Sequence, residues 1–256
     1  MGSLLRLEDI RVTFPTARGP VTAVENVGLD IQQGEFVSIV GPSGCGKSTL
    51  LHLIAGLRPP SGGTITYGGQ AVTDVNTRVG YITQRDTLLP WRTVERNISL
   101  AFDIAGKPDR ERVASLVRLV GLTGFEQHYP TEISGGMRQR VAIARTLAHD
   151  PETLLMDEPF GALDAQLRLS LQQTLLRIWE GSRKTVIFVT HDIEEAIALS
   201  DRIIVLSGRP AHVKEDVAVN LPRPRNVIAI RQDAAFRELF TRLWSALEMP
   251  ADEVQA

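Results

Sequence analysis

The feature that most constrains this chain of 256 residues is a glycine-rich segment between an apolar stretch and a helical pattern. Residues 41–48 read Gly-Pro-Ser-Gly-Cys-Gly-Lys-Ser and match the pattern G-x-x-x-x-G-K-[ST]. The strand pattern Val37–Val40 precedes the segment, and the helix pattern Thr49–Leu57 follows it. Glycines allow the backbone to curl so that N–H groups converge on phosphate oxygens at the positive end of a helix. The segment therefore predicts a phosphate-binding loop.

Two side chains of this loop are expected to contact phosphate or metal. Lys47 should reach the β- and γ-phosphates of a nucleotide, and the Ser48 hydroxyl should ligate Mg²⁺. The alternative, a plain glycine-rich turn, leaves the flanking patterns unexplained. Cys45 is interpreted as a small tolerated residue rather than a redox group, so a bulky thiol reagent should block nucleotide binding. As the single cysteine, it excludes an intramolecular disulfide and a zinc site built on several cysteines.

The strand patterns predict an α/β fold. Short, continuously apolar stretches are typical of parallel strands buried on both faces, and they lie at Val37–Val40, Thr153–Met156, Val186–Val189 and Ile203–Leu206. N-terminal stretches that alternate or lie beside glycines favour antiparallel strands, and these are Leu4–Phe14, Ala23–Ile31, Gly63–Tyr67 and Val79–Thr83. We therefore predict a phosphate-loop NTPase core with a mainly parallel sheet and an N-terminal antiparallel β subdomain.

Helix patterns replace strand patterns in the middle of the chain and return near its end. Residues 93–150 predict a helical subdomain inserted between the first and second parallel strands. After Gly208 we expect an irregular tail and then an amphipathic helix, whose apolar positions are Phe236, Leu239, Phe240, Leu243 and Leu247. The predicted domains are a nucleotide-binding domain over residues 1–220 and a C-terminal tail over residues 221–256.

Composition excludes several classes of protein. The chain has 28 Lys and Arg against 30 Asp and Glu, a net charge of −2, which argues against a general nucleic-acid binder. No apolar run approaches the roughly 18 residues of a membrane span, and the first residues do not resemble a signal peptide. We therefore expect a cytoplasmic enzyme or ATPase without a nucleic-acid partner.

Acidic side chains follow another predicted strand. Asp157 and Glu158 come directly after Thr153–Met156, and the carboxyl ends of parallel strands form the edge at which α/β sheets bind ligands. Asp157 suits Mg²⁺, and Glu158 could polarise the water that attacks the γ-phosphate. An acid pair at a strand end is common by itself, but the phosphate loop upstream favours the catalytic interpretation.

A histidine and a glutamine follow two further predicted strands. His191 follows Thr185–Thr190 at the same sheet edge, where it could contact the γ-phosphate and position Glu158 or the attacking water. Gln84 follows Val79–Thr83, and its amide oxygen can accept from water or ligate Mg²⁺. An ordinary surface polar role is the alternative for both.

A second candidate anion site begins another helix pattern. Ser134 is a suitable N-cap, and Gly135 and Gly136 present bare amides at the positive helix end. An ordinary helix start is the alternative. Because Ser134 is far along the chain from Lys47, binding of one phosphate by both would most naturally use two chains, each completing the other's site.

Taken in this order, the motifs resemble those of the nucleotide-binding subunit of an ATP-binding-cassette transporter, over roughly Leu4–Pro210. Gly41–Thr49 resembles the Walker A loop and Leu154–Pro159 resembles Walker B. Ile133–Met137 is similar to the family signature, although Ile133 and Met137 depart from its commonest form. The other matching positions are Gln84 of the Q-loop, Asp164 of the D-loop and the switch histidine His191. Within the loop, the resemblance assigns nucleotide contacts to Gly41, Ser43, Gly44, Cys45, Gly46, Lys47, Ser48 and Thr49.

The resemblance implies that two such subunits sandwich two ATP molecules head to tail and hydrolyse them. Ser134 and Gly136 of one chain would face the γ-phosphate held by Lys47 of the other. Asp164 would lie at the dimer interface. Phe14 stands where the family stacks an aromatic residue on adenine, and a core phenylalanine is the alternative.

Longer stretches resemble the importers for nitrate, sulfonates and taurine, namely Leu88–Trp91, Met137–Arg145 and Asp157–Gln166. The resemblance implies ATP-driven uptake of a small anion at the cytoplasmic face of the inner membrane. The implied partners are integral-membrane permease subunits, a second copy or paralogue of the cassette and, indirectly, a periplasmic or extracellular solute-binding protein.

Residues 84–96 are the predicted permease contact. Trp91 would anchor a partner helix there, and the alternative is that Trp91 packs inside the helical subdomain. The alternative function is a stand-alone cassette ATPase that acts on nucleic acid or the ribosome. A single phosphate loop and a short insert argue against it.

Overall fold

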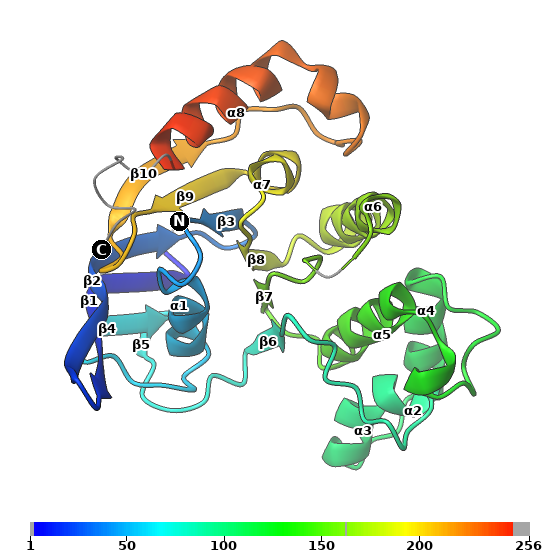
Figure 1. Cartoon of the computed structure of the whole chain (residues 1–256). Helices are drawn as coiled ribbons and strands as arrows, with labels where there is room; N and C mark the ends of the chain where they lie inside the picture. Colours follow the sequence, from blue (N-terminus) through cyan, green and yellow to red (C-terminus); the bar gives the residue numbers. More distant parts are fainter. Residues whose placement is uncertain (1–2, 162, 248–256) are drawn as a thin grey trace. The chain divides into compact units, whose positions relative to one another are not determined.

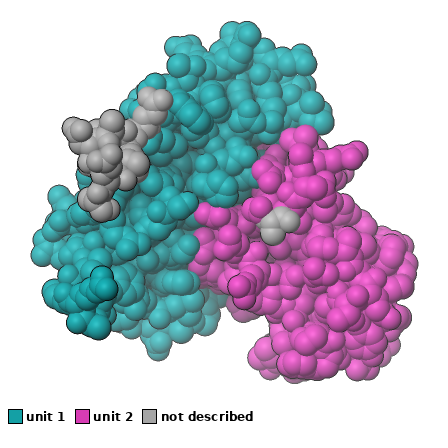
Figure 2. All heavy atoms as spheres, viewed as in Figure 1, with its two compact units in different colours: residues 1–77, 183–256 teal, residues 78–182 magenta. Residues whose placement is uncertain are grey.

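The computed structural model describes residues 3–161 and 163–247. These residues form two compact units (Figure 2). The first, here called the phosphate-loop unit, consists of residues 3–77 and 183–247. The second, here called the helical unit, consists of the described residues between 78 and 182. Residues 221–247 thus belong to the same unit as the phosphate loop, and the division into domains 1–220 and 221–256 stays a prediction.

The phosphate-loop unit contains an antiparallel sheet with the strand order β2-β1-β4-β5 (Figure 1). Its strands are β1 (Leu5–Thr16), β2 (Gly19–Ile31), β4 (Gly62–Tyr67) and β5 (Gln70–Ala71). Buried and exposed side chains alternate along most of β1, as in a strand with one face on the core. The antiparallel pairing of β1 with β2 and β4 confirms the prediction for these segments.

A second set of strands in the same unit has the order β10-β9-β3-β8. The strands are β3 (Phe36–Val40), β8 (Thr185–Val189), β9 (Arg202–Leu206) and β10 (Val213–Ala218). β3 pairs in parallel with both β8 and β9, and every residue of β3 and β8 is buried. Burial on both faces explains their uninterrupted apolar sequences. The helices of the unit are α1 (Lys47–Ile54), α7 (Ile193–Leu199), the 3₁₀ helix η2 (Ala229–Gln232) and α8 (Ala234–Leu247).

The helical unit contains two parallel strands, β6 (Val79–Ile82) and β7 (Thr153–Asp157), and a group of helices. The helices are α2 (Val94–Ile98), α3 (Leu100–Ala105), α4 (Arg110–Leu119), the 3₁₀ helix η1 (Pro130–Glu132), α5 (Gly135–Ala148) and α6 (Ala165–Ser182). α5 packs against α2, α3, α4 and α6, and it buries an apolar face that includes Val141, Ala144 and Leu147. Among the described residues, no helix is both long and apolar enough to cross a bilayer.

The structure corrects two predictions. Val79–Thr83 does not form an antiparallel strand, because β6 pairs with β7 in parallel from Val79 opposite Thr153. Gly80, whose presence favoured the antiparallel interpretation, is instead required for close packing, since a Cβ there would lie 2.5 Å from Thr146 Cγ2. The segment after Gly208 is not wholly irregular, because β10 pairs antiparallel with β9. This strand lacks an apolar pattern because it contains Lys214, Glu215 and Asp216. Such charges are typical of edge strands.

Candidate functional site

The phosphate loop connects β3 to α1 within the phosphate-loop unit. Gly44 and Gly46 have φ angles of 74° and 120°, in the region that favours glycine. A Cβ at Gly46 would also lie 3.0 Å from Val24 Cγ2, so the backbone passes close to β2. The first turn of α1, Lys47–Leu50, contains no acidic residue in the sequence, so its N–H groups and dipole favour an anion.

Lys47 is held inside the curve of this loop. Its side chain is only 5% exposed, and Nζ donates to the carbonyl oxygens of Gly41 at 2.8 Å and of Pro42 at 3.0 Å. The Cys45 N–H also donates to Pro42 at 3.3 Å. Ser43, Gly44 and Ser48 are exposed. The loop therefore combines a fixed ammonium with accessible hydroxyl and amide groups, which is the donor set that a polyphosphate requires.

Cys45 lies inside the loop and is 1% exposed. Burial raises the pKa of its thiol, and the charge of Lys47 and a main-chain hydrogen bond oppose this shift. The absent Cβ of Gly41 would lie 3.0 Å from Cys45 Sγ, so the thiol fills the space beside that glycine. The packing supports the interpretation of Cys45 as a small residue that the loop accommodates.

His191 leaves the same sheet edge as the phosphate loop. β3 and β8 run in parallel with Ile39 opposite Val189, and the Thr190 N–H donates to Ile39 O at 3.2 Å. His191 follows and is exposed, and Asp192 then caps α7 by accepting from the N–H groups of Glu194 and Glu195. Parallel pairing alone thus brings His191 to the edge from which the loop extends.

Phe14 lies near the end of β1 and is partly exposed, so it is not a core phenylalanine. The guanidinium carbon of Arg58 lies 4.3 Å from the centre of its ring, within the range of a cation–π contact. No spacing rule connects Arg58 to Phe14, so this contact could not be predicted from the sequence. Stacking of Phe14 on adenine stays a prediction.

The helical unit brings Gln84 and the two strand-end acids together. Gln84 Nε2 donates to Glu158 Oε2 at 3.5 Å, and Tyr81 Oη donates to Asp157 Oδ2 at 3.2 Å. Burial and the Asp157 charge raise the pKa of Tyr81, so its phenol remains a donor. Glu158 has a φ angle of 45°, an uncommon conformation for a non-glycine residue that is often found at functional sites. Tyr81 was missed because a strand tyrosine has no distinctive spacing.

The predicted signature residues begin α5 in the helical unit. Ser134 is the N-cap, and its hydroxyl accepts from the Met137 N–H at 3.3 Å. Gly135 is exposed, but Gly136 is buried against α6, where a Cβ would lie 2.2 Å from Leu167 Cδ2. Gly136 therefore has a packing role, which the pattern Ser-Gly-Gly at a helix start does not indicate. Asp164 is exposed and caps the first turn of α6 by accepting from the Leu167 N–H at 3.0 Å.

Two arginines of α5 hold the loop that follows Gln84. Arg138 Nε donates to Asp86 Oδ2 at 2.9 Å. Arg145 donates to Thr87 O at 2.9 Å and to Asp86 O at 3.2 Å, and burial lowers the pKa of its guanidinium. The structure thus connects the helix that begins at Ser134 to the residues next to Gln84.

The predicted metal ligands lie in both units, with Ser48 in the phosphate-loop unit and Gln84 and Asp157 in the helical unit. Among the described residues there is no cluster of three or more His, Cys, Asp or Glu side chains that could hold a metal ion alone. Hydroxyl, amide and carboxylate oxygens suit Mg²⁺, which is usually bound by few protein groups together with substrate phosphates. The donor set therefore fits magnesium that arrives with a nucleotide.

A phosphate loop after one buried parallel strand and acids at the end of another are the features of a phosphate-loop NTPase. Residues 24–161 match the family described as ABC transporter. The chain is 45% identical to the aliphatic sulfonates import ATP-binding protein SsuB of Bacillus thuringiensis subsp. konkukian, over 94% of this chain and 95% of that protein. It is 48% identical to the uncharacterized ABC transporter ATP-binding protein MJ0412 of Methanocaldococcus jannaschii, over 88% of this chain and 86% of that protein.

The fold is also found in a solved dimer of the ATP-binding cassette MJ0796 in a post-hydrolysis state bound to ADP and Pi. The TM-score is 0.75 with 32% identity, covering 85% of this chain and 100% of that one. The chain therefore belongs to the ABC transporter family, and it is an ATP-binding-cassette ATPase. This confirms the resemblance on which the motif assignments depend.

Substitution Gly136→Ala tests the contact between α5 and α6. The new Cβ would overlap Leu167, and overpacking of this kind costs about 1–3 kcal/mol, so we expect a lower Tm in thermal unfolding followed by circular dichroism. Gly135→Ala is the matched control, because its Cβ would lie 3.7 Å from the nearest atom, an Arg138 nitrogen. In a Leu167→Ala background the Gly136→Ala change should cost little more. Equal Tm values for the two glycine variants would contradict the packing.

The reactivity of Cys45 tests the burial of the loop. Thiolate is the nucleophile, so a raised pKa and 1% exposure predict slow alkylation by a maleimide near neutral pH and faster reaction as the pH rises. Once alkylated, the chain should lose ATP binding, measured with a fluorescent nucleotide. Denatured chain serves as the control for full accessibility. Unchanged ATP affinity after complete alkylation, confirmed by mass spectrometry, would refute the prediction.

Proposed function

We propose that this chain is the motor subunit of a membrane importer that takes up aliphatic sulfonates or chemically similar small anions. The proposed class of cargo rests on the 45% identity to a sulfonate import protein over almost the full length of both chains. The phosphate loop, the strand-end acids and His191 are all present, so the sequence retains the groups that ATP hydrolysis requires. The anionic cargo would be delivered by a separate solute-binding protein.

In this proposal the two sets of residues act on one ATP. Lys47 and the amides of residues 43–49 bind the β- and γ-phosphates, and Phe14 stacks on the base. Ser48, Asp157 and Gln84 would hold Mg²⁺, which neutralises phosphate charge when it is bound. Tyr81 orients Asp157 through its hydrogen bond. Glu158 accepts a proton from the attacking water, and His191 positions that water or Glu158.

The proposed assembly is a head-to-tail dimer of cassettes on two permease subunits, at the cytoplasmic face of the membrane. Ser134, Gly135 and Gly136 of one chain would bind the γ-phosphate held by the other chain, and Asp164 would lie between the two sites. The exposure of Ser134, Gly135 and Asp164 supports this role, since each is accessible to a second chain. Closure of the dimer on ATP and its reopening after hydrolysis would then drive the permease.

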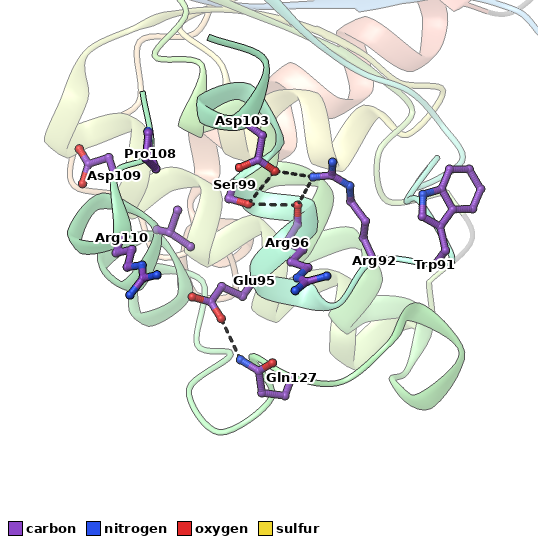
Figure 3. Close-up of a pocket in the computed structure, with 11 residues that line it drawn as sticks. Trp91, Arg92, Glu95, Arg96, Ser99, Asp103, Pro108, Asp109, Arg110 and Gln127 are labelled. Carbon is purple, nitrogen blue, oxygen red and sulfur yellow. Dashed lines mark hydrogen bonds and ion pairs between the residues drawn. The ribbon is translucent and has the colours of Figure 1, made fainter. Parts of the chain in front are cut away.

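A groove of about 750 Å³ in the helical unit is the proposed permease contact (Figure 3). Trp91 lies at its side and is 70% exposed, so the alternative in which Trp91 packs inside the helices is wrong. Arg92 is paired with Asp103 at 2.6 Å, and Gln127 donates to Glu95 at 2.8 Å. An exposed indole beside a polar groove fits an amphipathic helix of a membrane partner.

Substitution Glu158→Gln tests the catalytic base. An amide cannot accept the proton, so we expect ATP turnover to fall by about 100-fold or more, with ATP affinity retained and the dimer stabilised in ATP. Phosphate release and size-exclusion chromatography are the measurements. Glu152→Gln is the matched control, because Glu152 lies just before β7 and forms a partly exposed ion pair with Arg78 at 2.7 Å. Near wild-type hydrolysis by Glu158→Gln would remove Glu158 from this role.

Substitution Trp91→Ala tests the permease contact. Because the indole is exposed, we expect nucleotide affinity and Tm to remain unchanged, while co-purification with the permease and ATP-driven uptake decrease at least several-fold. Ile104→Ala is the control, because Ile104 is 79% exposed in the same helical unit and does not line the groove. Normal transport by Trp91→Ala would exclude the groove as the contact.

A further inference from the structure

The helix that follows His191 is held at its C-terminal end by an arginine of the tail. Arg225 is 3% exposed, and its Nη1 donates to Ser200 O at 2.6 Å and to Ile197 O at 3.3 Å. Its Nη2 donates to Val219 O at 3.2 Å and to Leu221 O at 3.1 Å. The last carbonyls of a helix have no partner within the helix and carry partial negative charge, which a guanidinium satisfies.

A second tail arginine continues this contact. Arg223 Nη2 donates to Leu199 O at 2.8 Å, and its Nε donates to Asp201 Oδ1 at 2.9 Å. The other carboxylate oxygen of Asp201 accepts from the Phe36 N–H at 3.1 Å, at the start of β3. The tail is therefore joined both to the end of α7 and to the strand that leads into the phosphate loop.

The N-terminal turn of α7 is held from the same segment. Arg231 of η2 forms an ion pair with Glu194, in the first turn of α7. Both η2 and α8 pack against α7, and α8 buries Phe236 and Leu243. Since α7 has only seven residues and begins two residues after His191, contacts at both of its ends fix the backbone from which the histidine extends.

We propose that the segment from Leu221 to Gln232 is a brace for α7, and that Arg225 and Arg231 are positioning residues for His191. A buried guanidinium whose Nη1 and Nη2 donate to carbonyls of both α7 and the tail carries this inference, because burial of a charge is tolerated only where hydrogen bonds compensate it. The brace rests on the proposed catalytic role of His191. It assigns to the tail a function in turnover that does not involve nucleotide contact.

Arg231 offers the cleanest test, because Arg225 is buried and its substitution would disturb folding as well as α7. Arg231→Ala should lower the kcat for ATP roughly tenfold with little change in KM, since the phosphate loop is untouched. Arg231→Lys, which can still pair with Glu194, should recover most of the loss. Arg242→Ala is the matched control, because Arg242 also lies in the C-terminal segment and pairs with a glutamate, Glu215 of β10. It should leave kcat unchanged.

A double-mutant cycle separates the brace from the role of His191. If Arg231 acts through the histidine, Arg231→Ala should have no further effect on single-turnover hydrolysis in a His191→Ala background. Full additivity would overturn the brace, whereas unchanged turnover in His191→Ala alone would overturn the role of the histidine. Amide hydrogen exchange gives a readout that is independent of activity. Arg231→Ala, but not Arg242→Ala, should accelerate exchange over residues 193–199, and equal exchange in both variants would contradict the brace.

Discussion

The rest of the phosphate-loop unit depends on the parallel pairing of β3 with β8 and β9. Every side chain of β3 is buried, so its register is fixed by packing on both faces. Because Ile39 lies opposite Val189, the strand that ends in the phosphate loop and the strand that ends before His191 stop at the same edge. Hydroxyls of Ser38 and Ser200, both buried, share a hydrogen bond that joins β3 to the end of α7. One register thus places the phosphate-binding loop, the histidine and α7.

Some glycines of this fold are required because neighbouring atoms leave no room for a Cβ, and others because the backbone has a positive φ. Gly46 has a positive φ, and a Cβ there would lie 3.0 Å from Val24 Cγ2, so both effects favour glycine. Gly136 belongs to the signature sequence, yet its buried side faces Leu167 of α6. A residue that is needed for packing and is also assigned to nucleotide contact cannot change without affecting both roles. The packing constraint shown here thus falls on a residue for which the family resemblance also predicts a nucleotide contact.

The sequence predicted the features that depend on local chemistry. The phosphate loop, the continuously apolar strands and the capping serine of α5 are each specified by neighbouring residues, so patterns of a few residues identify them. The predicted direction of β6 was wrong because a glycine in a short strand favoured antiparallel pairing, whereas Gly80 leaves room for Thr146, which a Cβ would approach to 2.5 Å. The strand β10 was missed because its charges belong to an edge strand. The contacts of Arg58 with Phe14 and of Tyr81 with Asp157 join distant segments, and no local pattern encodes them.

The contacts of the tail also join segments that are distant in the sequence, so local patterns do not predict them. The net charge of the whole chain is close to zero, so it does not single out the tail. By composition alone, the Pro- and Arg-rich stretch of the tail indicates an exposed, irregular segment. In the structure, however, Arg225 donates to main-chain carbonyls. Because every residue type has such a carbonyl, the acceptors of Arg225 cannot be recognised from the sequence. For this contact, the only side chain that the sequence has to specify is that of Arg225. The hold on α7 therefore depends on Arg223, Arg225 and Arg231, which all lie outside the nucleotide-binding motifs.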